Sequence, residues 1–258
     1  MAFELGTLRD HFLARRHTAL LVAIVSAFAV RPLIGDVGVS PFVFSIAFLI
    51  LMLIALYAIQ IDELVGERAL LLVQRRRRSI VGWTLAVLAI AERLATLFVP
   101  SPRLYLISSI SWLLFFSFVT WAELRSVLKQ KAVTSETISM SMSVYLLLGL
   151  SWGLLYVVLF ERQPQAFSFG SSPAPTFAEQ NVFPIFMYFS LTTLSTIGFG
   201  DITPVSLQAR YAAVAEGITG QFYLAILVAR LVGMQMSRTA GQGIDDQSRS
   251  PDRKVGRQ

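Results

Sequence analysis

The sequence has no cysteine, only two histidines and few charged residues. Of its 258 residues, 15% are charged and 55% are hydrophobic. Without cysteine there are no disulfides and no thiolate metal sites, and the redox compartment stays undetermined. His11 and His17, both near the N-terminus, do not make a metal site. A chain this apolar is not an ordinary soluble domain.

The sequence also lacks the residue constellations of an enzyme. It contains no arrangement of paired carboxylates or of a nucleophile with its base, so we expect no enzymatic activity and no organic cofactor. The net charge of +6 would suit nucleic acid, but the basic residues lie between and beyond the apolar runs, so we expect no nucleic-acid partner. No nucleotide-binding fold or calcium-binding loop follows the last apolar run, so a gating stimulus is not identified.

Six apolar runs dominate the sequence instead. They have roughly the ~20 residues that a transmembrane helix needs, and they cover residues 18–34, 41–61, 79–99, 104–121, 137–160 and 208–232. Most of the 22 lysines and arginines lie in the N-terminal tail, the second and fourth connections and the C-terminal end. The positive-inside rule therefore predicts a multi-pass protein of the plasma (inner) membrane with both termini in the cytoplasm.

The first apolar run has a competing interpretation. Arg15 and Arg16, the run itself and Ala27-Phe28-Ala29 resemble a signal peptide with its cleavage site. Arg31 directly after that site is unfavourable for cleavage, so we expect the run to be a retained helix. Cleavage would leave five helices with the same orientation.

A shorter apolar run lies before the last span. It covers residues 184–195, and a helix of that length reaches only about 18 Å, too short to cross a bilayer. A polar loop from Thr192 to Asp201 follows it and leads to the span at residues 208–232. Irregular backbone at membrane depth is tolerated only where it is buried in protein or lines a water-filled path. We therefore predict a re-entrant pore helix and a loop that lines a pore.

The residues of this loop suit the binding of a potassium ion. A dehydrated potassium ion needs oxygens such as rings of backbone carbonyls. Gly198 and Gly200 permit the alternating backbone that points successive carbonyls the same way, because glycine adopts positive φ without steric penalty. Thr196 adds a hydroxyl, and the short helix directs its partly negative C-terminal end at the pore.

The loop resembles the selectivity filter of the potassium channel family. Thr196-Ile197-Gly198-Phe199-Gly200-Asp201 is similar to the family's common form Thr-Val-Gly-Tyr-Gly-Asp. The resemblance implies potassium coordination at Thr196, Ile197, Gly198 and Phe199, with Asp201 at the outer mouth. It also implies an aromatic cuff at Tyr188 and Phe189 and further outer-mouth residues at Pro204, Ser206 and Arg210.

The same resemblance assigns roles around the filter. Filter support is expected from Tyr188, Phe189, Thr192, Thr193 and Ser195, an inner-helix hinge from Gly220 and Gly217, and a cavity lining from Gln221, Leu224 and Val228. Thr192 stands where some relatives carry a buried acid, and Phe199 lacks the phenol of tyrosine. Close helix packing is the alternative role for both glycines. Glu216 is expected to bond to the pore helix of its own or a neighbouring chain.

The fourth apolar run lacks the feature that voltage gating needs. Voltage-gated relatives carry arginines every third residue in this helix, but residues 104–121 contain none. We therefore predict an all-α membrane protein of six transmembrane helices with the architecture of voltage-gated channels, but without their usual voltage gating.

Four segments follow from this interpretation. They are a cytoplasmic tail at 1–17, a four-helix voltage-sensor-like domain with its linker at 18–131, a pore domain at 132–236 and a disordered tail at 237–258. Residues 122–136 are expected to run along the inner membrane surface as that linker. A basic run could attract anionic lipid headgroups or serve only as a topology signal; it consists of Arg75, Arg76, Arg77 and Arg78.

The predicted function is a potassium-selective channel subunit that conducts passively as a homotetramer, because one chain supplies one filter strand. Three alternatives stay open: a weakly selective cation channel, a potassium transporter subunit and a non-conducting regulatory subunit. Transporter loops recur several times in one chain and keep fewer glycines, whereas this sequence has one complete filter and no repeat.

Overall fold

The computed structural model describes the backbone of residues 16–34, 48–57, 72–98, 101–130, 132–170 and 182–249. Side chains are described for residues 17–29, 48–57, 80–92, 95, 101–130, 132–170 and 182–236. The expectations for the N-terminal tail up to residue 15, for the lipid contacts of Arg75 to Arg78 and for residues 250–258 lie outside these ranges.

The described part of the chain is helical apart from one small two-stranded sheet. In chain order the helices are α2 (Arg16–Ile34), a short helix at Phe48–Tyr57, α4 (Leu72–Phe98), α5 (Pro102–Lys129), α6 (Ser135–Arg162), α7 (Val182–Leu194) and α8 (Leu207–Arg249). Three of them are long and apolar enough to cross a membrane: Pro102–Lys129, Ser135–Arg162 and the segment Leu207–Met236 of α8. The protein is therefore a multi-pass membrane protein.

Local sequence explains where the two central helices begin. Ser101 caps α5, since its side chain accepts a hydrogen bond from the amide of Leu104, and Pro102 occupies the first turn, where no amide donor is needed. Thr134 caps α6 through a reciprocal capping box with Thr137. Only a few residues separate the end of α5 from the start of α6. The two helices therefore form a helical hairpin and pack against each other.

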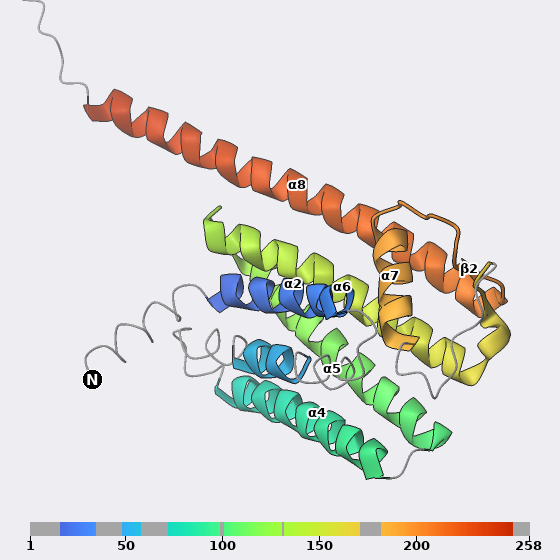
Figure 1. The fold of residues 1–258 in the computed structure, drawn as a ribbon. Coiled ribbons are helices and arrows are strands. Elements are labelled where there is room, and N and C mark those ends of the chain that lie inside the picture. The colour runs from blue at the N-terminus through green and yellow to red at the C-terminus, as the bar shows by residue number, and fades with distance from the viewer. Residues whose placement is uncertain are drawn as a thin grey trace, which may run out of the picture.

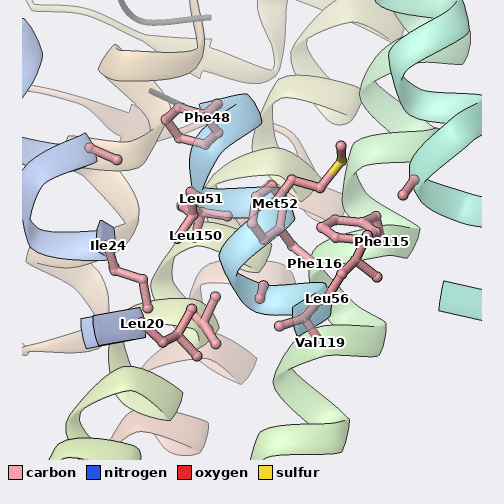
Figure 2. Packing of buried hydrophobic residues seen from close by; sticks show 14 of the residues in the cluster. Leu20, Ile24, Phe48, Leu51, Met52, Leu56, Phe115, Phe116, Val119 and Leu150 are labelled. Atoms are coloured by element: carbon pink, nitrogen blue, oxygen red, sulfur yellow. The ribbon is translucent and has the colours of Figure 1, made fainter. Parts of the chain in front are cut away.

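One apolar core joins the N-terminal helices to this hairpin. Figure 2 shows the helix at Phe48–Tyr57 lying between α2 and α5, with its side chains directed into the core. Phe48 packs edge-on against Phe116 of α5 at 5.9 Å between ring centroids and against Phe183 of α7 at 5.2 Å. Figure 2 also labels core residues of α2, α5 and α6: Leu20, Ile24, Phe115, Val119 and Leu150.

This core crosses the expected domain boundary near residue 131. Leu147 and Leu150 of α6 belong to the same cluster as the N-terminal helices. Residues 122–129, expected to form a linker along the inner membrane surface, are helical and continue α5 to Lys129. This segment has no helix-breaking residue, and Val127, one of its apolar residues, is buried against α6.

Buried and half-buried polar residues connect the start of α2 to the C-terminal part of α5 and the N-terminal end of α6. The Nδ1 atom of His17 lies 3.2 Å from a carboxylate oxygen of Glu123. The hydroxyl of Thr18 donates to Glu136 at 2.7 Å. Within the part of the chain that the structure describes, no three His, Cys, Asp or Glu side chains are placed to hold a metal ion.

The last helix is longer than expected. Figure 1 shows α8 running along the bundle and well beyond it, as far as Arg249. The expectation of disorder from residue 237 is therefore wrong for residues 237–249. No proline occurs between Pro204 and Pro251, and an established helix is extended at little further cost because each added residue gains a hydrogen bond.

Candidate functional site: pore helix, filter loop and inner helix

Two glycines of α6 form the seat of the short helix α7. A Cβ atom added at Gly149 would lie 2.8 Å from a methyl carbon of Leu191, and one added at Gly153 would lie 3.2 Å from the Cα of Met187. The two glycines are four residues apart, the small-residue spacing that lets helix backbones approach in membranes. Sequence reasoning missed this pair, although the spacing is visible in the sequence.

A small sheet shows that the chain enters and leaves the site at the same end. Strand β1 (Phe167–Ser168), just after α6, pairs antiparallel with β2 (Thr203–Pro204), just after the filter loop. The amides of Val205 and Ser206 also donate to the carbonyl of Ala166, at 2.7 and 3.2 Å. The intervening α7 has 13 residues, about 20 Å, so it descends part of the way and the loop returns. The chain before α7 and the chain after the filter loop therefore lie side by side, as the predicted re-entrant hairpin requires.

The filter loop alternates between two backbone conformations. Gly198 and Gly200 have φ angles of 55° and 80°, and Thr196 has a φ of 60°. Ile197 and Phe199 lie between them without positive φ. The predicted positive φ of both glycines is confirmed. Thr196 was not foreseen in this conformation, which is rare for a β-branched residue and marks backbone strain of the kind that accumulates at functional sites.

The last turn of α7 supports the base of the filter through a backbone carbonyl. The carbonyl of Thr192 accepts the amides of Ile197 at 2.9 Å and Gly198 at 3.1 Å. Meanwhile the hydroxyls of Thr192 and Thr193 donate to the carbonyl of Phe189, and that of Ser195 to Leu191. The supporting atoms of this segment are therefore carbonyls of α7, and the side chains stabilise the helix end.

The two residues of the expected aromatic cuff face different neighbours. Tyr188 stacks on Phe199 with ring centroids 6.3 Å apart and an interplanar angle of 2°. The carboxyl group of Asp201 also interacts electrostatically with the Tyr188 phenol. Phe189 turns the other way and meets Tyr156 of α6 at 4.9 Å. Only Tyr188 contacts the filter loop directly, and Phe189 belongs to the packing behind α7.

Glu216 of α8 is buried at the point where three helices meet. Its Oε2 atom accepts the hydroxyl of Tyr156 of α6 at 2.6 Å. Its Oε1 atom lies 2.5 Å from the hydroxyl oxygen of Ser190 of α7. The expectation that Glu216 bonds to the pore helix is confirmed, within its own chain. Sequence reasoning missed Ser190 and Tyr156 as its partners, because no motif marks them.

The two glycines proposed as hinges differ in their surroundings. A Cβ atom at Gly220 would lie 2.4 Å from the carbonyl oxygen of Leu194, at the end of α7, whereas one at Gly217 would meet nothing within 4 Å. Gly220 is therefore a close-packing position, the alternative considered from sequence. The helix α8 is continuous through both glycines in this structure, so a hinge remains a prediction.

The predicted cavity residues and the filter loop lie on the surface of the single chain. Gln221, Leu224 and Val228 are all exposed, as are residues 196–201. The same helix exposes large apolar side chains that include Phe222, Ile226 and Val232. Such apolar surface in a membrane protein contacts lipid or other protein.

Farther along its length, α8 is tied to the C-terminal end of α5 and to the first half of α6. Arg230 donates to the carbonyls of Leu128 and Gln130, each at 2.7 Å. These carbonyls belong to the C-terminal end of α5, where a cation is favourable. The hydroxyl of Tyr223 donates to the carbonyl of Ser141 of α6 at 2.6 Å.

Comparison with known proteins addresses this same region. Residues 144–236 match the profile of a family described as an ion channel. These residues are therefore similar to an ion-channel domain. The matched segment contains most of α6, all of α7, the filter loop and the apolar part of α8, and the matched family is one of ion channels.

Two curated proteins resemble part of the chain. Protein LctB of Bacillus caldotenax is 30% identical over 91 residues, which is 34% of this chain and 64% of that protein. Protein LctB of Geobacillus stearothermophilus is 31% identical over 86 residues, 32% of this chain and 60% of that protein. The chain thus spans less than two thirds of the length of either relative. No solved structure matches the chain significantly.

Proposed function

We propose that the protein is a potassium-selective channel subunit that conducts passively through its filter loop. The observation that carries this proposal is the alternation of positive and negative φ from Thr196 to Gly200, at the end of a helix too short to cross the membrane. Alternating conformations of this kind let successive carbonyls face one axis, where they replace the hydration shell of potassium. The resident ion is the substrate, held by Thr196, Ile197, Gly198 and Phe199.

A homotetramer completes this site. One chain contributes one strand of carbonyls, and a closed ring requires several. The exposed filter loop and the exposed apolar face of α8 support assembly, since both would be covered by neighbouring copies around an axis. Gln221, Leu224 and Val228 share one face of α8 by their spacing and would line the cavity below the filter.

The decisive experiment is a reversal potential. Purified full-length protein is inserted into a planar bilayer, with a potassium solution on one side of the bilayer and a sodium solution on the other. We expect a potential far from zero, with the sign set by potassium. A potential near zero with robust current would instead establish a weakly selective cation channel. Absence of current from every preparation that retains folded tetramer would favour a non-conducting subunit.

The conductance should depend only weakly on voltage. Moving one charge through the membrane field is worth ~2.3 kcal/mol per 100 mV, and steep opening requires several charges per subunit. The transmembrane part of α5, residues 104–121, has no lysine or arginine. We therefore propose a domain with the architecture of a voltage sensor but without the arginines that sense voltage. A steep conductance–voltage relation with several gating charges per subunit would contradict this prediction.

Orientation follows from the distribution of basic residues. The positive-inside rule places both termini in the cytoplasm, which puts the β1–β2 sheet and Asp201 at the outer face. The Arg230 contact with the end of α5 then lies at the inner face, on the side where the conduction path would close.

A further inference from the structure

The hydroxyl of Ser190 lies within hydrogen-bond distance of two acceptor oxygens, although it has only one proton to donate. The Ser190 hydroxyl oxygen lies 2.6 Å from the carbonyl oxygen of Gly149 and 2.5 Å from Oε1 of Glu216. Both distances fall in the range of complete O–H···O hydrogen bonds. A serine hydroxyl has one proton, and a carbonyl oxygen has none. Ser190 can therefore donate to only one of these two oxygens.

A proton on the carboxyl group of Glu216 would supply the missing hydrogen-bond donor. Ser190 then donates to the carbonyl of Gly149, which cannot donate, and Oε1 of Glu216 donates to Ser190. The Tyr156 hydroxyl donates to Oε2 of Glu216, 2.6 Å away. Three hydrogen bonds now use three protons. With an ionised Glu216, the same three contacts have only two protons.

The surroundings also disfavour a charge at this position. Glu216, Ser190 and Tyr156 are fully buried within the single chain. The titratable groups that face the carboxyl are the phenols of Tyr156 and, farther away, Tyr145, and no lysine, arginine or histidine of the described residues bonds to it. An unpaired carboxylate in such a place is costly, whereas a hydrogen-bonded neutral acid is not.

We propose that Glu216 is a neutral carboxylic acid that positions the pore helix by accepting a hydrogen bond from Tyr156 and donating one to Ser190. The chain of bonds links α8 to α6 through Tyr156 and to α7 through Ser190, and Ser190 links onward to α6 through Gly149. Ser190 lies two residues before Thr192, whose carbonyl holds the filter amides. A shift of α7 at Ser190 therefore moves the base of the filter.

The proposal predicts that Glu216→Gln, which replaces the acid by an amide, keeps the hydrogen bonds of the site. In Glu216→Gln the carbonyl oxygen accepts from Tyr156 and the amide nitrogen donates to Ser190, so every bond of the neutral acid has a counterpart. Glu216→Leu removes all these bonds, and Ser190→Ala removes the link to α7.

Two measurements on the full-length protein test the proposal. Infrared spectra at neutral pH should contain a carboxylic-acid C=O band that disappears in Glu216→Gln. Bi-ionic reversal potentials should give Glu216→Gln a potassium-to-sodium permeability ratio within about twofold of wild type, while Glu216→Leu and Ser190→Ala lower it roughly tenfold, equivalent to about 1.4 kcal/mol. Ser143→Ala is the matched control, since this buried serine of α6 bonds only to the carbonyl of Ser139 in its own helix.

The outcomes separate this proposal from the proposed function on which its second readout rests. An infrared spectrum without the acid band, or a Glu216→Gln variant as impaired as Glu216→Leu, would overturn the neutral acid. Unchanged permeability in Ser190→Ala would overturn the positioning role. If wild type itself does not discriminate potassium from sodium, the proposed function fails; the infrared band still decides the acid, and the ranking of cation conductance among the variants decides the positioning.

Discussion

Gly198→Ala should abolish selective potassium current. Gly198 has a φ of 55°, and an alanine there costs about 1–2 kcal/mol because its Cβ crowds the backbone. A Cβ atom at this position meets no other atom within 4 Å, so the effect comes from the backbone and not from a clash within the chain. In the proposed homotetramer this strain would occur four times, at one narrow site. The measurement is single-channel current with the bi-ionic reversal potential.

Gly170→Ala is the matched control for that experiment. Gly170 has a φ of 58°, almost the same as Gly198, but it lies between α6 and the pore helix, and a Cβ there would make only an ordinary van der Waals contact, 3.4 Å from the carbonyl oxygen of Asp201. This variant has the same backbone strain and should retain the wild-type reversal potential while its melting temperature falls. Equal loss of selectivity in both variants would mean that general destabilisation, not filter geometry, explains the effect.

Gly220→Ala should destabilise the pore domain. The added methyl carbon would lie 2.4 Å from the carbonyl oxygen of Leu194, well inside van der Waals contact, so α8 has to move away from the end of α7. Overpacking of this kind typically costs 1–3 kcal/mol. We expect a clearly lower melting temperature of the purified protein. Any change in channel opening would then accompany loss of packing rather than isolate a hinge.

Gly217→Ala provides the comparison on the same helix. Its added Cβ meets nothing within 4 Å inside the chain, and alanine is favoured over glycine in a helix by about 0.5–1 kcal/mol. The melting temperature should therefore stay level or rise. A fall as large as that of Gly220→Ala would show that Gly217 packs against a neighbouring copy in the assembly.

Hydrophobic periodicity and length predict the helices α5 to α8 well, because each is a long apolar segment with clear ends. The same reasoning fails where composition changes without a helix breaker. Residues 237–249 look disordered because they are polar, but α8 continues through them. Polarity predicts exposure to water, not the end of a helix.

The filter was predictable from sequence because its chemistry is local. Gly198 and Gly200 take positive φ for reasons contained in their own backbone. The parts that were missed depend on residues far apart in the chain. Glu216 meets Ser190 and Tyr156 only after α6, α7 and α8 have packed, and no spacing rule encodes that meeting. The seat at Gly149 and Gly153 was encoded by spacing and overlooked.

The length of α8 gives small motions of this helix mechanical leverage. One of its contacts with the pore helix is at Gly220, and the helix continues from there for 29 residues to Arg249, about 44 Å. A tilt of roughly 10° about that contact would displace the far end by about 8 Å while moving atoms near Leu194 very little. Four such arms around one axis would convert a force on their ends into a change of pore width, with the Arg230 contact as a restraint along the arm.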